Sequence, residues 1–225
     1  MSVFISILFF VILLLLFFTF RKSRVRSEES LFLESNEEDK LLSEEEVFAL
    51  ALGDLEHERI ASEIEELTLE AYLKKEWGLT FDEGREREHT LYALQKIWSK
   101  GTRYLLFENM QFEKMVSVSD TVAFDSARFS ELIREAIYLG YLEEEEAWGL
   151  LFLNAERVQE AFSSSKEFIN AYFSALVLFK FSKLEEEEKK SFEFDVELEL
   201  LKSHSTVNIV WLEEELFSQF EIYKK

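Results

Sequence analysis

Four consecutive glutamates, Glu143–Glu146, lie between Gly140-Tyr141 and the apolar run that begins at Trp148. Clustered carboxylates can bind metal ions, act in acid–base catalysis or dock a basic partner. They also occur in the first turn of a helix, where they face the positive end of its dipole. We expect Glu143 to Glu145 to have this structural role. Glu146, next to Ala147 and Trp148, stays a candidate for a further one.

Asp125 and Arg128 are a second pair with chemical potential, because they lie three residues apart in a segment with helical periodicity. That spacing allows a local ion pair on one helix face. Their neighbours Phe124 and Ala127 are apolar, so we expect the pair to border the core. Asp125, Arg128 and Glu146 are therefore the candidate catalytic residues. The sequence leaves open whether they form a site or a structural network.

Two carboxylate–histidine pairs, Asp54-x-x-His57 and Glu86-x-x-His89, have the i, i+3 spacing of ligands in carboxylate-bridged metal bundles. Such bundles also need inward glutamates from two further helices. Both histidines have charged neighbours and look solvent-facing, and a chain with 46 acidic residues contains chance pairs. We expect no metal site.

Signatures of common enzyme classes are missing from the sequence. Cysteine is absent, there is no Gly-x-Ser-x-Gly motif, and no glycine-rich phosphate loop occurs. We therefore expect no cofactor. An enzyme of unrecognised type remains the alternative reading.

Composition sets the broad class of the chain. The net charge of −21 argues against nucleic-acid binding, because phosphate backbones are bound by basic surfaces. Apolar residues make up 48% of the 225 residues, with 23 phenylalanines, which is ample material for a core. Proline is absent and glycine occurs six times, so few helix breakers are present. The composition favours a mainly α fold with long helices.

The N-terminus predicts a membrane anchor. Residues 3–20 contain no charged side chain, and 18 helical residues span roughly 27 Å, close to the thickness of the hydrocarbon core of a bilayer. Four cations follow at positions 21, 22, 24 and 26, which places the following domain on the cytoplasmic side. We expect a transmembrane helix over 1–20, and a basic flank with an acidic linker over 21–40.

Residues 41–182 are expected to form a compact multi-helix domain. Ser43-x-x-Glu46 and Thr80-x-x-Glu83 match the capping box that begins a helix, and Gly53 and Gly101 mark breaks. Helices are predicted over 56–76, 120–139, 143–161 and 165–182, and residues 103–118 are also assigned as helical.

Residues 183–225 are expected to be an extension that packs on this domain. Within it, residues 192–200 alternate apolar and acidic side chains, which is typical of an exposed strand. Residues 204–212 are rich in β-branched residues and suit a partner strand. A short β-ribbon and a helix are nearly equal readings of this region.

The segments 123–151 and 161–175 resemble a bacterial family described as domain of unknown function 1266, and the resemblance covers about residues 44–182. The stretches 50–53 and 76–84 also resemble the start of that family. Phe124 stands where the family usually has tryptophan, and a C-terminal Ser-Pro-Trp-like segment has only a weak counterpart near 205–211. The resemblance implies a mostly helical domain without an established activity. Matching residues are Asp125, Arg128, Gly140, Tyr141, Glu146, Ala147, Trp148, Phe162, Ser163, Ser164 and Tyr172.

The sequence thus favours a protein-interaction module at the bacterial inner membrane, with its C-terminal domain in the cytoplasm. A large acidic surface would steer a basic partner. An immunity or antitoxin-like protein that neutralises a basic toxin is one concrete version. The rival reading is an enzyme that uses Asp125, Arg128 and Glu146.

Overall fold

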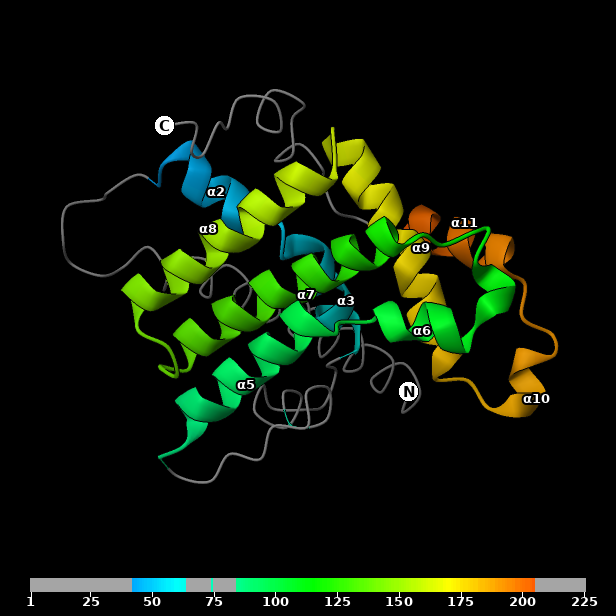
Figure 1. The fold of residues 1–225 in the computed structure, drawn as a ribbon, viewed down its shortest axis with the longest axis horizontal. Helices are drawn as coiled ribbons and strands as arrows, with labels where there is room; N and C mark the ends of the chain where they lie inside the picture. The colour runs from blue at the N-terminus through cyan, green and yellow to red at the C-terminus, as the bar shows by residue number, and fades with distance from the viewer. Residues whose placement is uncertain (1–41, 64–73, 75–83, 205–225) are drawn as a thin grey trace, which may run out of the picture. The chain divides into compact units, whose positions relative to one another are not determined.

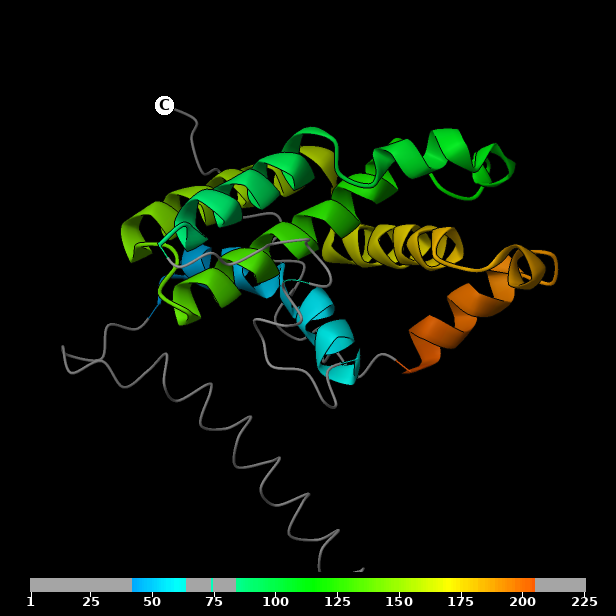
Figure 2. The ribbon, with the colours of Figure 1, turned by 90° about the horizontal axis from the view of Figure 1, so that it is seen from below.

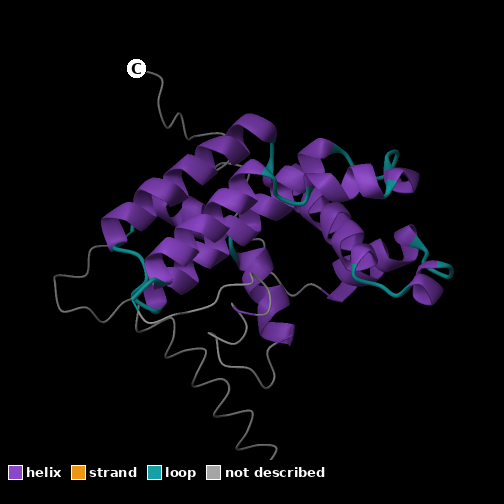
Figure 3. Ribbon diagram, turned by 60° about the horizontal axis from the view of Figure 1, so that its bottom comes forward, coloured by secondary structure: helices purple, strands orange, loops and turns teal. Residues whose placement is uncertain are grey.

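The computed structural model describes residues 42–63, residue 74 and residues 84–204, and all the regular elements there are helical (Figures 1 and 3). Contacts divide the chain into two units, Met1–Leu42 and Ser43–Lys225, so nearly all described residues belong to the second. The described elements are α2 (Glu44–Ala51), α3 (Asp54–Glu63), α5 (Glu86–Ser99), α6 (Arg103–Glu108), η1 (Met110–Phe112), α7 (Val118–Tyr138), α8 (Glu144–Ala161), α9 (Ser165–Ser182), α10 (Glu186–Lys189) and α11 (Phe194–His204).

Helix α7 is the centre of the domain. It packs against α2, α3, α5, α6, α8 and α9 (Figures 1 and 2). Most of its side chains are buried. Several of the buried residues are small, including Ala123, Ser126, Ala127 and Ser130, which lets neighbouring helices approach closely. A buried side chain on α7 therefore faces another helix rather than water.

Helix α8 follows α7 through a tight corner and returns alongside it. Gly140 has a φ of 72°, a conformation that favours glycine, and the Tyr141 amide donates to the Ala136 carbonyl at 2.7 Å. Asn154 on α8 donates to the Ser126 carbonyl at 2.8 Å and to Ser130 Oγ at 2.9 Å. These contacts fix the register of the two helices.

Two groups of buried apolar side chains form the core. The larger group joins α2, α5, α7, α8 and α9, with Phe48, Phe124, Leu151, Phe168 and Tyr172 among its members. The smaller one lies under α6 and η1 and joins them to α9 and α11. Its members are Leu105, Leu106, Phe112, Val116, Val177, Leu178, Phe181 and Phe194.

Helix starts follow local chemistry. The predicted capping box at Ser43 and Glu46 is confirmed, with the Ser43 amide donating to Glu46 Oε2 at 2.7 Å. A second capping box, at Ser117 and Asp120, begins α7. The predicted breaks at Gly53 and Gly101 are also confirmed, since α2 ends at Ala51 and α5 at Ser99. The predicted box at 80–83 and the part of the 56–76 helix after residue 63 lie outside the described residues.

The strand interpretation of residues 192–200 is wrong. Residues 194–200 lie in α11, which begins at Phe194 and packs against α9. Phe194, Leu198 and Leu201 recur at helical spacing and contact the core, so the 3.6-residue period prevails over the alternation. The proposed partner strand lies, apart from position 204 in α11, outside the described residues.

None of the described helices is long and apolar enough to cross a membrane. The predicted anchor, residues 3–20, lies outside the described part of the chain.

Candidate functional site

Five charged side chains meet where α3 packs against α7. We call this group the α3–α7 cluster: Asp54 and His57 come from α3, and Glu131, Arg134 and Glu135 from α7. His57 Nδ1 lies 2.7 Å from Glu131 Oε1. Arg134 Nη1 lies 2.8 Å from Asp54 Oδ1 and 3.3 Å from Glu131 Oε2. Spacings of three and four residues place each helix's contributors on one face.

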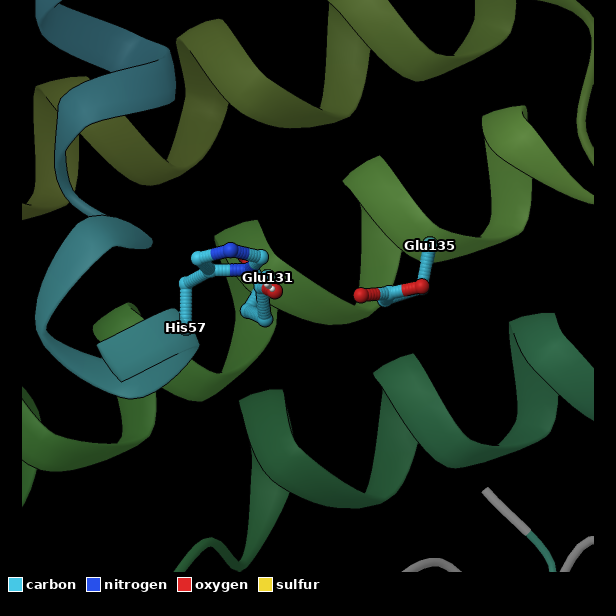
Figure 4. Close-up of side chains that lie close together, drawn as sticks. All are labelled: His57, Glu131 and Glu135. Atoms are coloured by element: carbon cyan, nitrogen blue, oxygen red, sulfur yellow. Dashed lines mark hydrogen bonds and ion pairs between the residues drawn. The ribbon is translucent and has the colours of Figure 1, made fainter. Parts of the chain in front are cut away.

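The cluster runs from the interior to the surface. The Glu131 side chain is 2% exposed, whereas the His57 side chain is 48% exposed. Glu131 fits beside the α2–α3 turn because Gly53 has no side chain: a Cβ there would lie 3.2 Å from Glu131 Oε2. Figure 4 shows His57, Glu131 and Glu135 pointing toward one another. A buried carboxylate is thus connected to solvent through an imidazole.

The pKa values of two carboxyl groups in the cluster, Glu131 and Glu135, are shifted in opposite directions. Burial and then repulsion by Glu131 raise the pKa of Glu135 to about 8. Burial works in the same direction on Glu131, but Arg134 and His57 outweigh it and hold the pKa of Glu131 below its ordinary value. The hydrogen bond to Glu131 raises the pKa of His57. At neutral pH, Glu131 is therefore ionised while Glu135 retains a proton.

Two kinds of chemistry suit such a group. A protonated Glu135 beside an ionised Glu131 is an acid–base pair of the kind that divides roles between two carboxyl groups. Alternatively, His57, Glu131 and Glu135 can each offer one ligand atom, and these atoms lie within 4.8 Å of one another. In the described part of the chain, no other group of three potential ligands meets this spacing.

The sequence indicates two of the five residues of this cluster, the Asp54-x-x-His57 pair. The His57 side chain is 48% exposed, in agreement with the solvent-facing position that its charged neighbours predict, but its contact with Glu131 on α7 is not predicted from the sequence. The available signal was Glu131, which lies four residues after buried Ala127 and so falls on the buried face of α7. A buried carboxylate requires a partner.

Asp125 has a structural role, because it holds the start of α6 against α7. Its two carboxylate oxygens accept from the backbone amide of Thr102 at 3.0 and 2.8 Å, at the start of α6. Arg128 Nη1 lies 4.0 Å from Asp125 Oδ1. Burial raises the pKa of Asp125 to about 6, although the Thr102 amide and Arg128 oppose the shift. The pair Asp125–Arg128 predicted from the sequence is thus brought together inside the domain.

Arg128 and Tyr172 connect Asp125 to a further buried group. The Arg128 guanidinium lies over the Phe124 and Phe179 rings, 5.3 and 5.1 Å from their centroids. Tyr172 on α9 donates from its hydroxyl toward Glu56 Oε2 at 3.1 Å and the Leu55 carbonyl at 3.2 Å. The Arg128 contacts join α7 to α9, and the Tyr172 hydrogen bonds join α9 to α3.

Glu146 does not join Asp125 and Arg128. It binds Arg87 on α5 through two hydrogen bonds of 3.0 and 2.6 Å at the surface. On α8, the residue that lies next to Asp125 is Asn154, because it donates to the carbonyl of Ser126. Glu146 lies eight residues before Asn154, which is roughly 12 Å along the helix. The three candidate catalytic residues are therefore divided between an internal pair and a surface ion pair.

Comparison with known proteins identifies a family. The family model described as "Protein of unknown function (DUF1266)" matches residues 33–213. The chain belongs to this family. The match extends beyond the 44–182 resemblance at both ends and includes α10 and α11. No curated protein and no solved structure gives a significant match to the chain.

The remaining residues of the DUF1266 resemblance lie at helix junctions and in the core. Gly140 and Tyr141 form the α7–α8 corner, and Trp148 stacks on Phe152 with centroids 5.7 Å apart. Phe162 ends α8 and packs edge-on against Phe168 at 5.5 Å. In the first turn of α8, Glu144 Oε1 accepts from Trp148 Nε1 at 3.3 Å. The Gly140–Tyr141 corner and the Phe162–Phe168 contact set the positions of α8 and α9, whereas the two Trp148 contacts lie within α8.

An exposed apolar surface lies apart from these internal contacts. Tyr104 and Phe107 lie three residues apart on α6, and Met110 follows in η1. All three are exposed, and we call them the α6–η1 surface. Phe107 is 71% exposed and Met110 66%. Beneath them, Leu105, Leu106 and Phe112 hold the segment on the smaller core. A firmly seated segment thus presents large apolar side chains to water.

Proposed function

We propose that this chain is a non-catalytic protein-interaction module whose partner binds the α6–η1 surface. The observation that carries the proposal is the exposure of Phe107 and Met110 on a segment anchored in the core. Large aromatic and methionine side chains are enriched in protein interfaces, where their burial contributes much of the binding free energy.

The charge around this surface supports contact with a protein. Residues 103–118 contain two cations and two anions, so the segment is neutral within a chain of net charge −21. A neutral apolar patch avoids the cost of burying charge, while the acidic remainder attracts a basic partner from a distance. A basic toxin neutralised by an immunity-like protein is one partner with this chemistry.

We place this module at the cytoplasmic face of a bacterial inner membrane. The uncharged run 3–20 and the four cations that follow it support this location. The anchor would confine the partner search to the membrane surface.

An enzyme that uses Asp125, Arg128 and Glu146 is the weaker alternative. Asp125 already accepts the Thr102 amide, and Glu146 is bound to Arg87 on another face of the fold. The Asp125–Arg128 pair holds α6 to α7, and this structural role explains its burial without a catalytic one.

Co-purification from native membranes tests the proposal. The full chain and its Phe107→Ser/Met110→Ser variant are extracted in mild detergent, and bound proteins are quantified by mass spectrometry. A specific partner should be enriched at least tenfold by the wild-type chain and lost with the variant. A matched control, Tyr138→Ser, changes an exposed aromatic residue elsewhere and should retain the partner. A partner retained equally by both variants would overturn the assignment of this surface.

A further inference from the structure

We propose that His57, Glu131 and Glu135 form a binding site for one divalent transition-metal ion, Zn²⁺ or an ion of similar chemistry. The three side chains converge from α3 and α7 (Figure 4), and their ligand atoms lie within 4.8 Å of one another. This inference does not depend on the protein-binding role proposed above.

The spacing suits a single ion. Ligand atoms about 2.0–2.1 Å from a tetrahedral Zn²⁺ are roughly 3.3 Å apart. His57 Nδ1 and Glu131 Oε1 are now 2.7 Å apart, joined by a hydrogen bond. Replacing the shared proton with a metal ion requires these two atoms to separate by about half an ångström. His57 is half exposed, so its ring can make that adjustment.

The ligand types select the class of metal. One imidazole and two carboxylates are a nitrogen–oxygen set, which suits zinc and neighbouring transition metals. Calcium and magnesium prefer oxygen ligands alone. Three protein ligands also leave a coordination position for water or another molecule.

Glu131 and Glu135 share a proton that a metal ion would displace. Glu131 as a whole residue is 1% exposed, and its carboxylate contacts His57, Arg134 and, through a side-chain hydrogen bond, Glu135. Metal ligands bind in their deprotonated form, so binding of the ion would release this proton. Coordination would replace the hydrogen bond between the two carboxyl groups with bonds from both to the metal.

The surrounding charges match a divalent cation. Metal ligands bind in their deprotonated form, so Glu135 loses its proton when the ion binds. The carboxylates of Asp54, Glu131 and Glu135 and the Arg134 guanidinium then give a formal charge of −2. Asp54 holds Arg134 at 2.8 Å, and Arg134 in turn contacts Glu131. Outer partners of this kind orient metal-binding carboxylates. Asp54 and Arg134 are therefore positioning residues rather than ligands.

Titration calorimetry of the chelator-treated full chain in detergent tests the site, with ZnCl₂, MnCl₂ and MgCl₂ as probes. We expect one Zn²⁺ per chain, tighter binding at pH 8 than at pH 6, and no comparable binding of Mg²⁺. His57→Ala and Glu135→Gln should each weaken Zn²⁺ binding at least tenfold. Glu135→Gln preserves shape and removes a ligand, so circular dichroism should show an unchanged fold.

Matched controls separate this site from surface binding. His89→Ala and Glu146→Gln remove a histidine and a carboxylate from other parts of the fold and should leave Zn²⁺ affinity unchanged. Three results would overturn the proposal: no Zn²⁺ binding by the wild-type chain, unchanged binding after Glu135→Gln in a folded protein, or equal loss with the control variants.

Discussion

The Asp125 carboxylate occupies the space that a side chain at position 101 would need: a Cβ on Gly101 would lie 1.8 Å from Asp125 Oδ2. Gly101 also has a φ of 50°, which disfavours other residues. The glycine therefore allows the α5–α6 corner to approach α7, where Asp125 accepts the Thr102 amide.

Gly101→Ala should destabilise the domain by about 3 kcal/mol or more, because it adds both backbone strain and a clash. Gly140→Ala is the matched control: its φ is 72°, but a Cβ there meets nothing within 4 Å. It should cost only about 1 kcal/mol. Guanidinium unfolding of both variants measures the difference. Equal losses would show that Asp125 does not require Gly101.

Asp125 should make stability depend on pH. The pKa of Asp125 is raised to about 6 in the folded chain from an ordinary 3.8. The protonated carboxyl group therefore contributes folding stability at low pH, and this stability is lost as pH rises through 6. Asp125→Asn cannot ionise. The stability of the wild type relative to this variant should fall by about 1 kcal/mol between pH 5 and pH 8. Parallel profiles from unfolding experiments across this range would refute the assignment.

Tyr172→Phe should cost about 1–2 kcal/mol of folding stability, because it leaves a buried acceptor on Glu56 with one fewer donor. Tyr92→Phe removes the same hydroxyl from an exposed residue on α5 and should change stability by less than about 0.5 kcal/mol. Thermal unfolding of the two variants provides the comparison. A neutral Tyr172→Phe would mean that the hydroxyl does not hold α9 to α3.

Two glutamates should respond differently to the same change. Glu146→Gln weakens a surface ion pair with Arg87 and should cost at most about 0.5 kcal/mol. Glu131→Gln removes the buried partner of His57 and Arg134 and should cost about 2 kcal/mol or more. Denaturant midpoints measure both. The account fails if Glu146→Gln is the more damaging variant.

The helices of this domain were largely predictable because their signals are local. The predicted 143–161 and 165–182 segments agree with α8 and α9 to within a residue, since caps and apolar periodicity mark both ends. The strand prediction for residues 192–200 is wrong because two apolar residues of the alternating pattern, Phe194 and Leu198, also lie at helical spacing, which Leu201 continues.

The polar contacts were less predictable because they join distant parts of the chain. Glu131 lies 74 residues from His57, and Glu146 lies 59 residues from Arg87. The chain has 46 acidic residues, and the packing of the helices decides which of them meets each cation. Glu131 meets His57 where α7 contacts α3, and Glu146 meets Arg87 where α8 contacts α5. Asp125 and Arg128 were paired correctly because three residues separate them on one helix.

Site-specific photo-crosslinking in cells tests the proposed α6–η1 interface most directly. A benzoylphenylalanine is placed at position 107 of the full chain, and at the exposed position 92 on α5 as the control. The account predicts a discrete adduct with a different protein from position 107 and none from position 92. The interface would be contradicted by no adduct from position 107, by the same adduct from both positions, or by an adduct of twice the 26.7 kDa chain mass.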